Sequence, residues 1–364
     1  MQENSKLSNI VSQFLDVNNQ SQITPISTGL INDTYLIDLK QNKSKYILQK
    51  INKNVFPEPE KVMKNLINIT KHLHLNVDNN YELLTLTKTK NESSFLIDDD
   101  DEYWRLYKYI DQTRTVEQIS DPNLVYEAAK AFGNYIKRLV DLDPKQIFET
   151  IKYFHNYRNR VQKLEQAIQK NAYKRLATCI EEVKMVKERL QYIDQYYSLK
   201  LPVRIIHSDT KIDNILFDDQ LKRAVCVIDL DISMPGSILY DFGDMVRYNT
   251  NSTKEDDPNI DQINLNKEIF HLLSLGFIEE TFSILTTVEK ENLLLGAKLV
   301  ILIQAIRYLT DYLSGDIYYK IQYDSHNIIR TKNQLHFLKC VEREEKELLK
   351  IINSVYFKMD NTNT

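Results

Sequence analysis

Two stretches of sequence decide the fold: residues 204–217, RIIHSDTKIDNILF, and residues 225–231, VCVIDLD. Each opens with a short apolar run that is typical of a buried strand, and each ends in a polar segment that contains acids. The first has the pattern H-x-D-x-K-x-x-N, in which Asp209 precedes Asn214 by five residues. The second ends its apolar run at Asp229. Pairing of the two strands would bring two carboxylates and an amide together.

That spacing matches the catalytic loop of kinases, in which an Asp accepts the proton of the substrate hydroxyl and an Asn holds Mg²⁺. Phosphoryl transfer needs an acceptor oxygen in line with the γ-phosphate and a metal charge that bridges the β- and γ-oxygens. We therefore predict that Asp209 is the catalytic base and that Asn214 and Asp229 are metal ligands, with ATP and Mg²⁺ as cofactors. Asp231 lies on the same strand face and is a candidate to share the metal.

Two nearby residues receive supporting roles in this interpretation. His207 is interpreted as an orienting, hydrogen-bonded histidine rather than a proton carrier. Residues 241–243 spell the Asp-Phe-Gly of protein kinases, but they lie farther from Asn214 than Asp229 does, and no apolar strand precedes them. We predict that the Asp241 carboxylate caps the helix that starts there or braces the catalytic loop. The less favoured alternative is that Asp229 and Asp231 are only acids of a turn, with no role in catalysis.

Composition excludes several classes of function. The chain has 364 residues, 47 Lys and Arg against 51 Asp and Glu, and a net charge of −4, so it lacks the basic field that grips nucleic acid. Three scattered cysteines fit neither a disulfide framework nor a zinc site, and they predict a reducing, cytoplasmic location. The N-terminus does not resemble a signal peptide, and the best apolar run, 299–303, is too short for a membrane span. The sequence contains no Rossmann or P-loop glycine motif.

The pattern along the chain predicts an α+β fold, with a small β-rich lobe followed by a large helical lobe. Alternating apolar residues over 23–51 indicate a hairpin, and helical spacing begins near Pro57. A long helical pair is expected over 144–202, and a buried helix over 292–313. Further strands are expected at 81–87, 95–97 and 103–110. The two predicted domains are residues 1–110 and 111–364.

Residues 228–247, IDLDISMPGSILYDFGDMVR, resemble the I-D-L-D-T-V-M-P-G…D-[FY]-G-D block of N-acetylhexosamine 1-kinases. These enzymes belong to the aminoglycoside phosphotransferase and choline kinase group. The departures are Ile232-Ser233, where Thr-Val is usual, and Ser208, where Gly is commoner. The same resemblance extends over STGLINDTYLI (27–37), YILQKINKNVF (46–56) and RYLTDYLSGDIYYKIQYDSHNIIRTKNQ (307–334), and so over nearly the whole chain. It implies a bilobal, protein-kinase-like fold, with nucleotide bound by the N-terminal lobe and the acceptor bound by the helical lobe.

The resemblance also implies a nucleotide site in the N-terminal lobe. Gly29 would let backbone N–H groups approach the phosphates, and Asn32 and Thr34 would donate hydrogen bonds to them. A lysine on the next strand normally meets the α- and β-phosphates. Lys50 is the only basic residue in that strand, although the register leaves Gln49 as a rival.

Two further nucleotide contacts follow from the same resemblance. The helix acid that would pair with the strand lysine is Glu60 or Glu58, between which the sequence does not choose. The adenine is expected to lie against the backbone of residues 107–111.

The C-terminal block supplies the expected acceptor site. Arg307 lies in an otherwise apolar helix, where an uncompensated guanidinium would be costly to bury, so it needs a partner. One alternative is a structural ion pair with Asp311, one turn further on. The resemblance favours a contact between Arg307 and the substrate, with Asp316, Tyr318 and Asn327 as neighbours.

The sequence thus predicts an ATP- and Mg²⁺-dependent kinase that phosphorylates the anomeric hydroxyl of an N-acetylhexosamine, with a small-molecule sugar as its partner. One alternative is a kinase of another small-molecule hydroxyl, such as an aminoglycoside, choline or homoserine. The acid cluster of residues 255–257 would usually be a solvated loop, but it would also attract a cationic aminoglycoside. The second alternative is a nucleotide-binding pseudokinase that acts as an interaction module.

Overall fold

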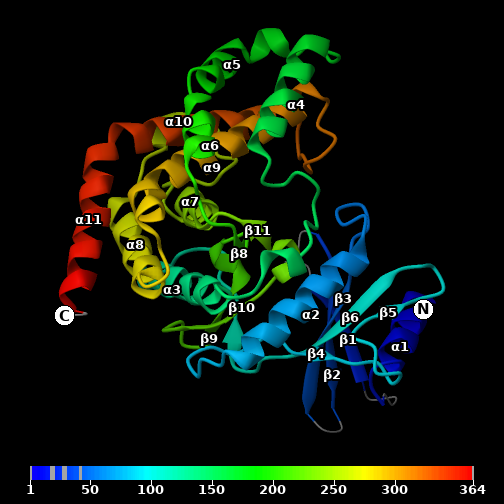
Figure 1. Ribbon diagram of the computed structural model, residues 1–364. Helices are drawn as coiled ribbons and strands as arrows, with labels where there is room; N and C mark the ends of the chain where they lie inside the picture. The colour runs from blue at the N-terminus through cyan, green and yellow to red at the C-terminus, as the bar shows by residue number, and fades with distance from the viewer. Residues whose placement is uncertain (1, 17–20, 27–30, 41–42, 363–364) are drawn as a thin grey trace.

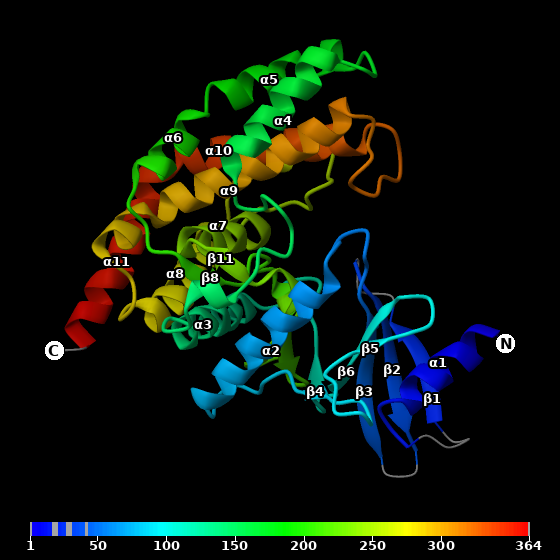
Figure 2. The same ribbon diagram turned by 45° about the vertical axis from the view of Figure 1, so that its right-hand side comes forward.

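The computed structural model describes residues 2–16, 21–26, 31–40 and 43–362. A small lobe built on a sheet lies beside a larger helical lobe, as Figures 1 and 2 show. The N-terminus is in the small lobe, and the C-terminus is at the far side of the helical lobe. The predicted α+β architecture is therefore confirmed.

The small lobe is an antiparallel sheet with the strand order β1-β2-β3-β6-β4, in which β5 also pairs with β6. Helices cover both faces of this sheet. Leu48 and Trp104 pack against the apolar side of α1, while Ile47 and Tyr107 belong to the core on the side of α2. The elements are α1 (Gln2–Ser12), β1 (Ser21–Ile26), β2 (Asp33–Leu39), β3 (Ser44–Lys50), α2 (Pro59–Leu75), β4 (Leu86–Thr87), β5 (Leu96–Ile97) and β6 (Tyr103–Lys108).

Most sequence predictions for this lobe are confirmed, with one element much shorter than expected. The hairpin is β2 and β3, in register from Asp33 opposite Lys50, and β1 is a separate strand in front of it. Helix α2 begins with Pro59 and carries Glu60 in its first turn, as helix starts prefer. Of the strand expected over 81–87, only the last two residues form a strand, β4. The earlier part bonds to the helical lobe instead, because the N–H of Glu82 donates to the carbonyl oxygen of Val225 in β10 (Ala224–Val227).

The helical lobe contains long helices and two small sheets, with the orders β10-β9-β7 and β11-β8. The long helical pair expected over 144–202 is three helices, α4, α5 and α6. The helices are α3 (Asn123–Arg138), α4 (Tyr157–Lys170), α5 (Ile180–Lys187), α6 (Gln191–Ser198), α7 (Ile238–Asn249), α8 (Lys267–Thr281), α9 (Thr287–Leu313), α10 (His326–Arg343) and α11 (Glu345–Thr362). The remaining strands are β7 (Thr113–Arg114), β8 (Arg204–Ile206), β9 (Ile215–Asp218) and β11 (Met234–Gly236).

Helix α9 is the central helix of this lobe. It starts with a capping box, in which the side chains of Thr286 and Glu289 each bond the backbone N–H of the other. By length and composition it would be able to cross a membrane, but 83% of its apolar 18-residue stretch is buried inside the protein. That burial identifies it as a core helix.

Helices α7 and α9 touch through their backbones. A Cβ atom on Gly243 would lie 2.4 Å from the carbonyl oxygen of Gly296, and one on Gly296 would lie 2.3 Å from that of Leu239. Only glycine allows such an approach. Helix α7 in turn bonds the loop after β8, because Asp244 Oδ2 accepts the N–H of Thr210 at 3.0 Å. The catalytic segment is thus attached to the core of the lobe.

Candidate active site

The catalytic loop, residues 207–214, runs from β8 to β9 and is held by a buried carboxylate of α7. Asp241 accepts the backbone N–H groups of His207 at 2.7 Å and of Ser208 at 2.8 Å. Helix α7 is capped instead by Ser237, whose side chain accepts a backbone N–H from its first turn. Of the two roles expected for Asp241, the structure therefore selects the brace for the catalytic loop.

His207 is a fixed, neutral side chain beneath this loop. Its Nδ1 accepts the N–H of Asp209 at 3.3 Å, which assigns the ring proton to Nε2, so that Nε2 donates to the carbonyl oxygen of Ile228 at 2.9 Å. Burial lowers the pKa of His207 below its ordinary value, although both of these bonds oppose the effect. The structure thus gives His207 the orienting role expected from the sequence.

Asp209 has the environment of an ionised carboxylate that a ligand can reach. Its Oδ1 forms an ion pair with Lys211 at 2.9 Å, and its Oδ2 accepts a hydrogen bond from Asn214 at 3.0 Å. The side chain remains 22% exposed. Burial works to raise the pKa of Asp209, but the charge and hydrogen bond of Lys211 outweigh it, so the pKa lies below the ordinary value.

Asn214 and Asp229 are brought together by backbone pairing. The N–H of Ile228 donates to the carbonyl oxygen of Asn214 at 2.9 Å, so the following residue, Asp229, lies beside the end of the catalytic loop. Asp229 has a left-handed backbone, with φ 58° and ψ 61°, a strained conformation often found at functional sites. The expected juxtaposition of the two residues is therefore present.

The two side chains fit a divalent cation. Burial raises the pKa of Asp229 to about 7, and the charges of Asp231 and Asp209 add to the effect. No described group donates a hydrogen bond to the Asp229 carboxylate. The amide nitrogen of Asn214 bonds Asp209, which leaves its Oδ1 as an acceptor. Carboxylate and amide oxygens are ligands that Mg²⁺ accepts, and a cation would offset the gathered negative charge.

Asp231 does not share this site, which corrects the sequence interpretation. Its carboxylate accepts two hydrogen bonds from the guanidinium of Arg105, at 2.6 Å and 2.8 Å, and both side chains are 1% exposed. Arg105 also donates to Gln49 Oε1 at 2.8 Å and 3.1 Å. Sequence reasoning missed Arg105, although a lone arginine in the aromatic strand YWRLYK was the available signal.

The register of β3 also overturns the expectation for Lys50. Lys50 is paired with Trp104, whereas Gln49 is paired with Arg105. Because neighbouring side chains in a strand point to opposite faces, Lys50 lies on the α1 side of the sheet. There its Nζ is 2.7 Å from Asp33 and 6.0 Å from the centre of the Trp104 ring. Gln49 is the residue on the face of Arg105.

The other residues expected at the phosphates lie on that same face or outside the described chain. Gly29 lies outside the described residues. The amide nitrogen of Asn32 donates to Asp231 at 2.7 Å, and Thr34 Oγ1 accepts from Gln49 at 3.2 Å. Asn32, Thr34 and Gln49 therefore line the side of the small lobe that meets the helical lobe.

Neither helix acid pairs with the strand lysine. Glu58 forms an ion pair with Lys61 at 2.7 Å, and Glu60 lies 3.9 Å from Lys64. The pairing that the resemblance implied is thus not present, because Lys50, Glu58 and Glu60 all have other partners.

Arg307 lies in an aromatic cluster and does not form the alternative ion pair with Asp311. Its Nη1 donates to Gln304 Oε1 at 2.9 Å. No carboxylate of the described residues lies within salt-bridge distance of its guanidinium, so ring contacts offset part of its burial. The guanidinium carbon is 5.5 Å from the ring centres of Phe154 and Tyr319 and 6.0 Å from that of Tyr318.

The remaining predicted acceptor residues mostly hold the loop after α9 in place. Asp311 accepts the N–H groups of residues 317–319 at 2.9–3.0 Å and the amide of Asn327 at 2.9 Å. Asp316 is an ion-pair partner of Arg175 and accepts from Asn327 at 2.8 Å. These contacts and the burial of both side chains give Asp316 and Asn327 a structural role, and no described contact places them at the acceptor, so their predicted role in sugar binding stays a prediction. Tyr318 remains beside Arg307.

The acid cluster 255–257 is not free to attract a cation. Glu255 accepts hydrogen bonds from Arg247 and from the hydroxyl of Tyr308. Asp256 lies 3.3 Å from Nε2 of the buried His326. The aminoglycoside argument drawn from this cluster therefore loses its basis.

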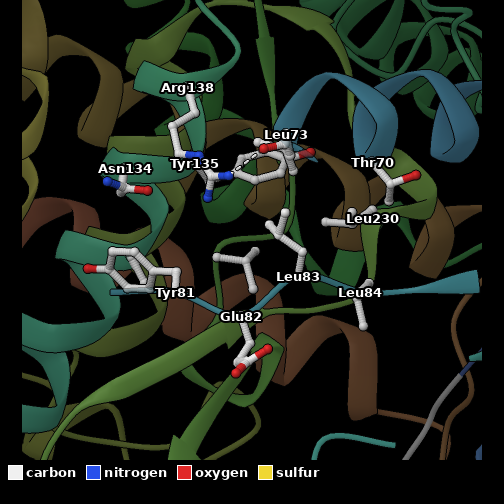
Figure 3. A pocket seen from close by; sticks show the side chains of 12 residues that line it. Thr70, Leu73, Tyr81, Glu82, Leu83, Leu84, Asn134, Tyr135, Arg138 and Leu230 are labelled. Carbon is white, nitrogen blue, oxygen red and sulfur yellow. Dashed lines mark hydrogen bonds between the residues drawn. The ribbon is translucent and has the colours of Figure 1, made fainter. Parts of the chain in front are cut away.

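A small cavity lies close to the site, between α2, α3 and the segment before β4 (Figure 3). It is lined in part by Leu230, the residue after Asp229, and at one side Arg138 donates to the carbonyl oxygen of Leu73 at 2.6 Å. Its volume of about 20 Å³ suffices for one water molecule. The cavity is a packing gap rather than a substrate site.

Comparisons with known proteins agree with this geometry. A family model described as the phosphotransferase enzyme family (APH) matches residues 22–272. The microcompartment-associated aminopropanol kinase is similar in structure, with a TM-score of 0.60 and 14% identity over 95% of this chain and 98% of that one. Spectinomycin phosphotransferase, solved with ADP and spectinomycin, gives a TM-score of 0.58 and 12% identity over 97% and 98%. Choline kinase from Cryptosporidium parvum Iowa II gives 0.54 and 13% over 98% and 99%.

The structural likenesses show the kinase-like fold, and the family match covers more than half of the chain, including the catalytic loop and Asp229. The residues that this fold brings together are the carboxylate of Asp209, the amide of Asn214 and the buried carboxylate of Asp229, which are the groups that phosphoryl transfer uses. The chain therefore belongs to the phosphotransferase enzyme family.

Proposed function

We propose that the protein is an ATP-dependent kinase that phosphorylates the anomeric hydroxyl of an N-acetylhexosamine and releases the sugar 1-phosphate. The observation that carries the kinase part is the convergence of Asp209, Asn214 and Asp229 at one end of the catalytic loop. The aromatic cluster around Arg307 and the sequence resemblance to N-acetylhexosamine 1-kinases support the sugar as the acceptor.

In this mechanism Asp209 orients the anomeric hydroxyl and accepts its proton. The sugar oxygen forms a bond to the γ-phosphorus, the bond from that phosphorus to the β–γ bridging oxygen breaks, and ADP leaves. Lys211 keeps Asp209 ionised before the reaction, since the ion pair favours the charged carboxylate. His207 and Asp241 hold the loop so that the base is already in position.

Asn214 and Asp229 would hold Mg²⁺, which supplies positive charge to the β- and γ-phosphate oxygens when bound. The turn at residues 27–35 would cover the phosphates, with Gly29, Asn32 and Thr34 as donors. Gln49 takes the place given to Lys50 on the inner face. The adenine would lie against the backbone of residues 107–111.

A second candidate is a kinase of another small-molecule hydroxyl. The fold likeness to proteins described as an aminopropanol kinase, a choline kinase and a spectinomycin phosphotransferase is the observation that keeps it in view. A pseudokinase is disfavoured because the base and both metal ligands are present.

The test is a coupled ADP-release assay with N-acetylglucosamine, N-acetylgalactosamine, choline, homoserine and kanamycin as acceptors. We expect turnover with an N-acetylhexosamine and none with its methyl glycoside, which lacks the free anomeric hydroxyl. Asp209→Asn gives the background rate of the preparation. Turnover with an amine acceptor, or with the methyl glycoside, would refute the proposal, as would no turnover with any acceptor.

A further inference from the structure

The start of α4 and the segment before it contain several unsatisfied buried polar atoms. In the described chain, His155 Nδ1, Asn159 Oδ1 and Arg160 Nε are buried from water and have no hydrogen-bond partner. Buried polar atoms nearly always have a hydrogen-bond partner, so three unpaired ones close together in the sequence are unusual for a region with only a structural role. It is expected where a ligand or water completes the bonding.

Arg160 shares its surroundings with Arg307. Helix α4, which carries Arg160, packs against α9, and Arg307 of α9 lies over the rings of Tyr318 and Tyr319, whose hydroxyls also act electrostatically on Arg160. Burial lowers the pKa of Arg160 below its ordinary value, and the charge of Arg307 lowers it further. Two cationic side chains thus lie in one partly buried group.

Neither charge has an acid partner in the part of the chain that the structure describes. Among the described residues, no Asp or Glu oxygen lies within 4.0 Å of either guanidinium, although both Arg105 and Arg247 have such partners elsewhere in the molecule. Like charges without a counter-charge destabilise one another when buried. The free energy of this group would fall if a bound molecule supplied acceptor oxygens.

The group borders the catalytic loop. His155 Nε2 is 3.0 Å from the hydroxyl of Ser208, which directly precedes Asp209. Arg307 lies over the ring of Phe154, the neighbour of His155. The unsatisfied His155 and the two guanidiniums therefore lie beside the segment of the catalytic loop that leads into Asp209.

We propose that Arg160 and Arg307 form a cationic wall of the acceptor site, which binds an acceptor through a carbonyl or carboxylate oxygen and excludes acceptors that carry an ammonium group. The inference rests on the proposed kinase function, because it assigns this surface to the acceptor. The proposal adds Arg160 to the residues that determine acceptor specificity. It also predicts that this protein, unlike kinases of amines, rejects acceptors that carry an ammonium group. An ammonium group here would add a third positive charge to two that have no acid partner.

The test compares two acceptors that differ only in the group on C2: N-acetylglucosamine, with an acetamide, and glucosamine, with an amine. We expect kcat/KM for protonated glucosamine to be at least about tenfold below that for N-acetylglucosamine, the effect of one charged hydrogen bond lost or one repulsion gained. Raising the pH until the amine of glucosamine is neutral should bring the two kcat/KM values closer together. Both sugars are measured at each pH, so that any titration of the enzyme affects both values equally.

The variants assign the effect to Arg160. In Arg160→Gln, the ratio of kcat/KM for N-acetylglucosamine to kcat/KM for protonated glucosamine should fall by about tenfold. Arg160→Lys keeps the charge, so it should keep most of the preference for N-acetylglucosamine. Arg158→Gln is the matched control, because Arg158 is an exposed arginine of the same helix that lies over Tyr197 at 4.4 Å, away from the cluster. Unchanged KM for ATP and unchanged melting temperature would show that Arg160→Gln is folded.

Two results would overturn the inference: equal use of N-acetylglucosamine and protonated glucosamine by the wild type, or an unchanged ratio in a folded Arg160→Gln variant. Failure of the sugar proposal is a distinct outcome. If only a non-sugar acceptor is turned over, that compound is compared with its amine or acyl analogue in the same way. A preference for the ammonium form would then refute the proposal that Arg160 and Arg307 form a cationic wall.

Discussion

Arg105 and Asp231 form a buried bidentate ion pair, with distances of 2.6 Å and 2.8 Å, between strand β6 of the small lobe and the turn after β10 of the helical lobe. The turn also contains Asp229, so the ion pair ties the candidate metal ligand to the central strand of the small lobe. Gln49 and Asn32 complete the bonding of the two charged groups.

Breaking this pair on one side should destabilise the protein strongly. Asp231→Ala leaves the Arg105 guanidinium buried without its counter-charge, so we expect a loss of about 3–5 kcal/mol in the free energy of unfolding. The double variant Arg105→Met/Asp231→Leu removes both charges and should recover most of that loss. Urea denaturation of the three proteins measures the effect. A double variant that is no more stable than Asp231→Ala would show that the loss does not come from an unpaired Arg105.

Replacing the base should stop the chemistry without disturbing the fold. Asp209→Asn keeps the shape of the side chain but does not accept a proton, and loss of a general base lowers the rate by ~10²–10⁴. Nucleotide affinity and melting temperature should stay near those of the wild type. Retention of more than about a tenth of kcat, well short of that loss, would mean that Asp209 is not the base.

Asp229→Asn should abolish turnover and yet stabilise the protein when no metal is bound. Because the pKa of Asp229 is raised to about 7, the folded state disfavours the ionised carboxylate, and stability falls as the pH rises from near 4 to 7. An amide has no such charge, and Asn tolerates the left-handed backbone at this position. At pH 8 we expect a gain on the order of 2 kcal/mol, measured by denaturation with a chelator present.

Asp241→Ala provides the contrast to Asp229→Asn. It removes the acceptor of two buried backbone N–H groups, each of which costs ~1–3 kcal/mol when left unbonded. Stability should therefore fall, with a smaller loss of turnover than in Asp229→Asn. A sharply raised Mg²⁺ requirement in Asp241→Ala, together with an active Asp229→Asn, would assign the metal to Asp241 instead.

Arg307→Ala and Asp311→Ala should have different effects, because the two side chains are not partners. Loss of a charged hydrogen bond to the acceptor is worth roughly 1.5–3 kcal/mol, so Arg307→Ala should raise the sugar KM about ten- to a hundredfold and leave the ATP KM unchanged. Asp311→Ala should lower the melting temperature, since the N–H groups of residues 317–319 lose their acceptor. A lower melting temperature of Arg307→Ala with an unchanged sugar KM would remove Arg307 from the site.

His155 should make the protein less stable in acid. Burial, with the charges of Arg160 and Arg307, lowers the pKa of His155 to about 3, so below about 6.5 the unfolded chain takes up a proton that the folded protein does not. This contribution to stability is complete above that pH and is lost as the pH falls toward 3, by about 1 kcal/mol per pH unit. His155→Gln should flatten the pH dependence, and His271→Gln, at an exposed position of α8, should not.

Local spacing was sufficient to predict the catalytic loop. Asp209 and Asn214 lie on one short segment, and the apolar run before Asp229 pairs with it as strands of this kind do. The faces of β3 were harder to predict, because Gln49 and Lys50 are adjacent and both polar. A shift of one residue exchanges their faces, and only the pairing with Arg105 and Trp104 decides between them.

The acceptor side depends on contacts between distant segments, which explains the errors there. Asp311 is one turn from Arg307 and seemed a natural partner by helix spacing, yet its oxygens are used by the loop that follows α9. Arg160 belongs to a helix rich in charged residues and resembles a solvated position in sequence. Its burial beside Arg307 arises only when α4 packs against α9.

The backbone contact of α7 with α9 at Gly243 and Gly296 joins the helix that holds the catalytic loop to the helix that carries Arg307. The catalytic loop is bonded to α7 and Arg307 belongs to α9, so Asp209 and one of the two residues of the proposed acceptor wall are attached to the same pair of touching helices. In the proposed kinase, a movement of the small lobe relative to these helices would change the distance between Asp209 and the nucleotide but not the distance between Asp209 and Arg307. Nucleotide entry and exit are therefore not expected to change the positions of Asp209 and Arg307 relative to each other.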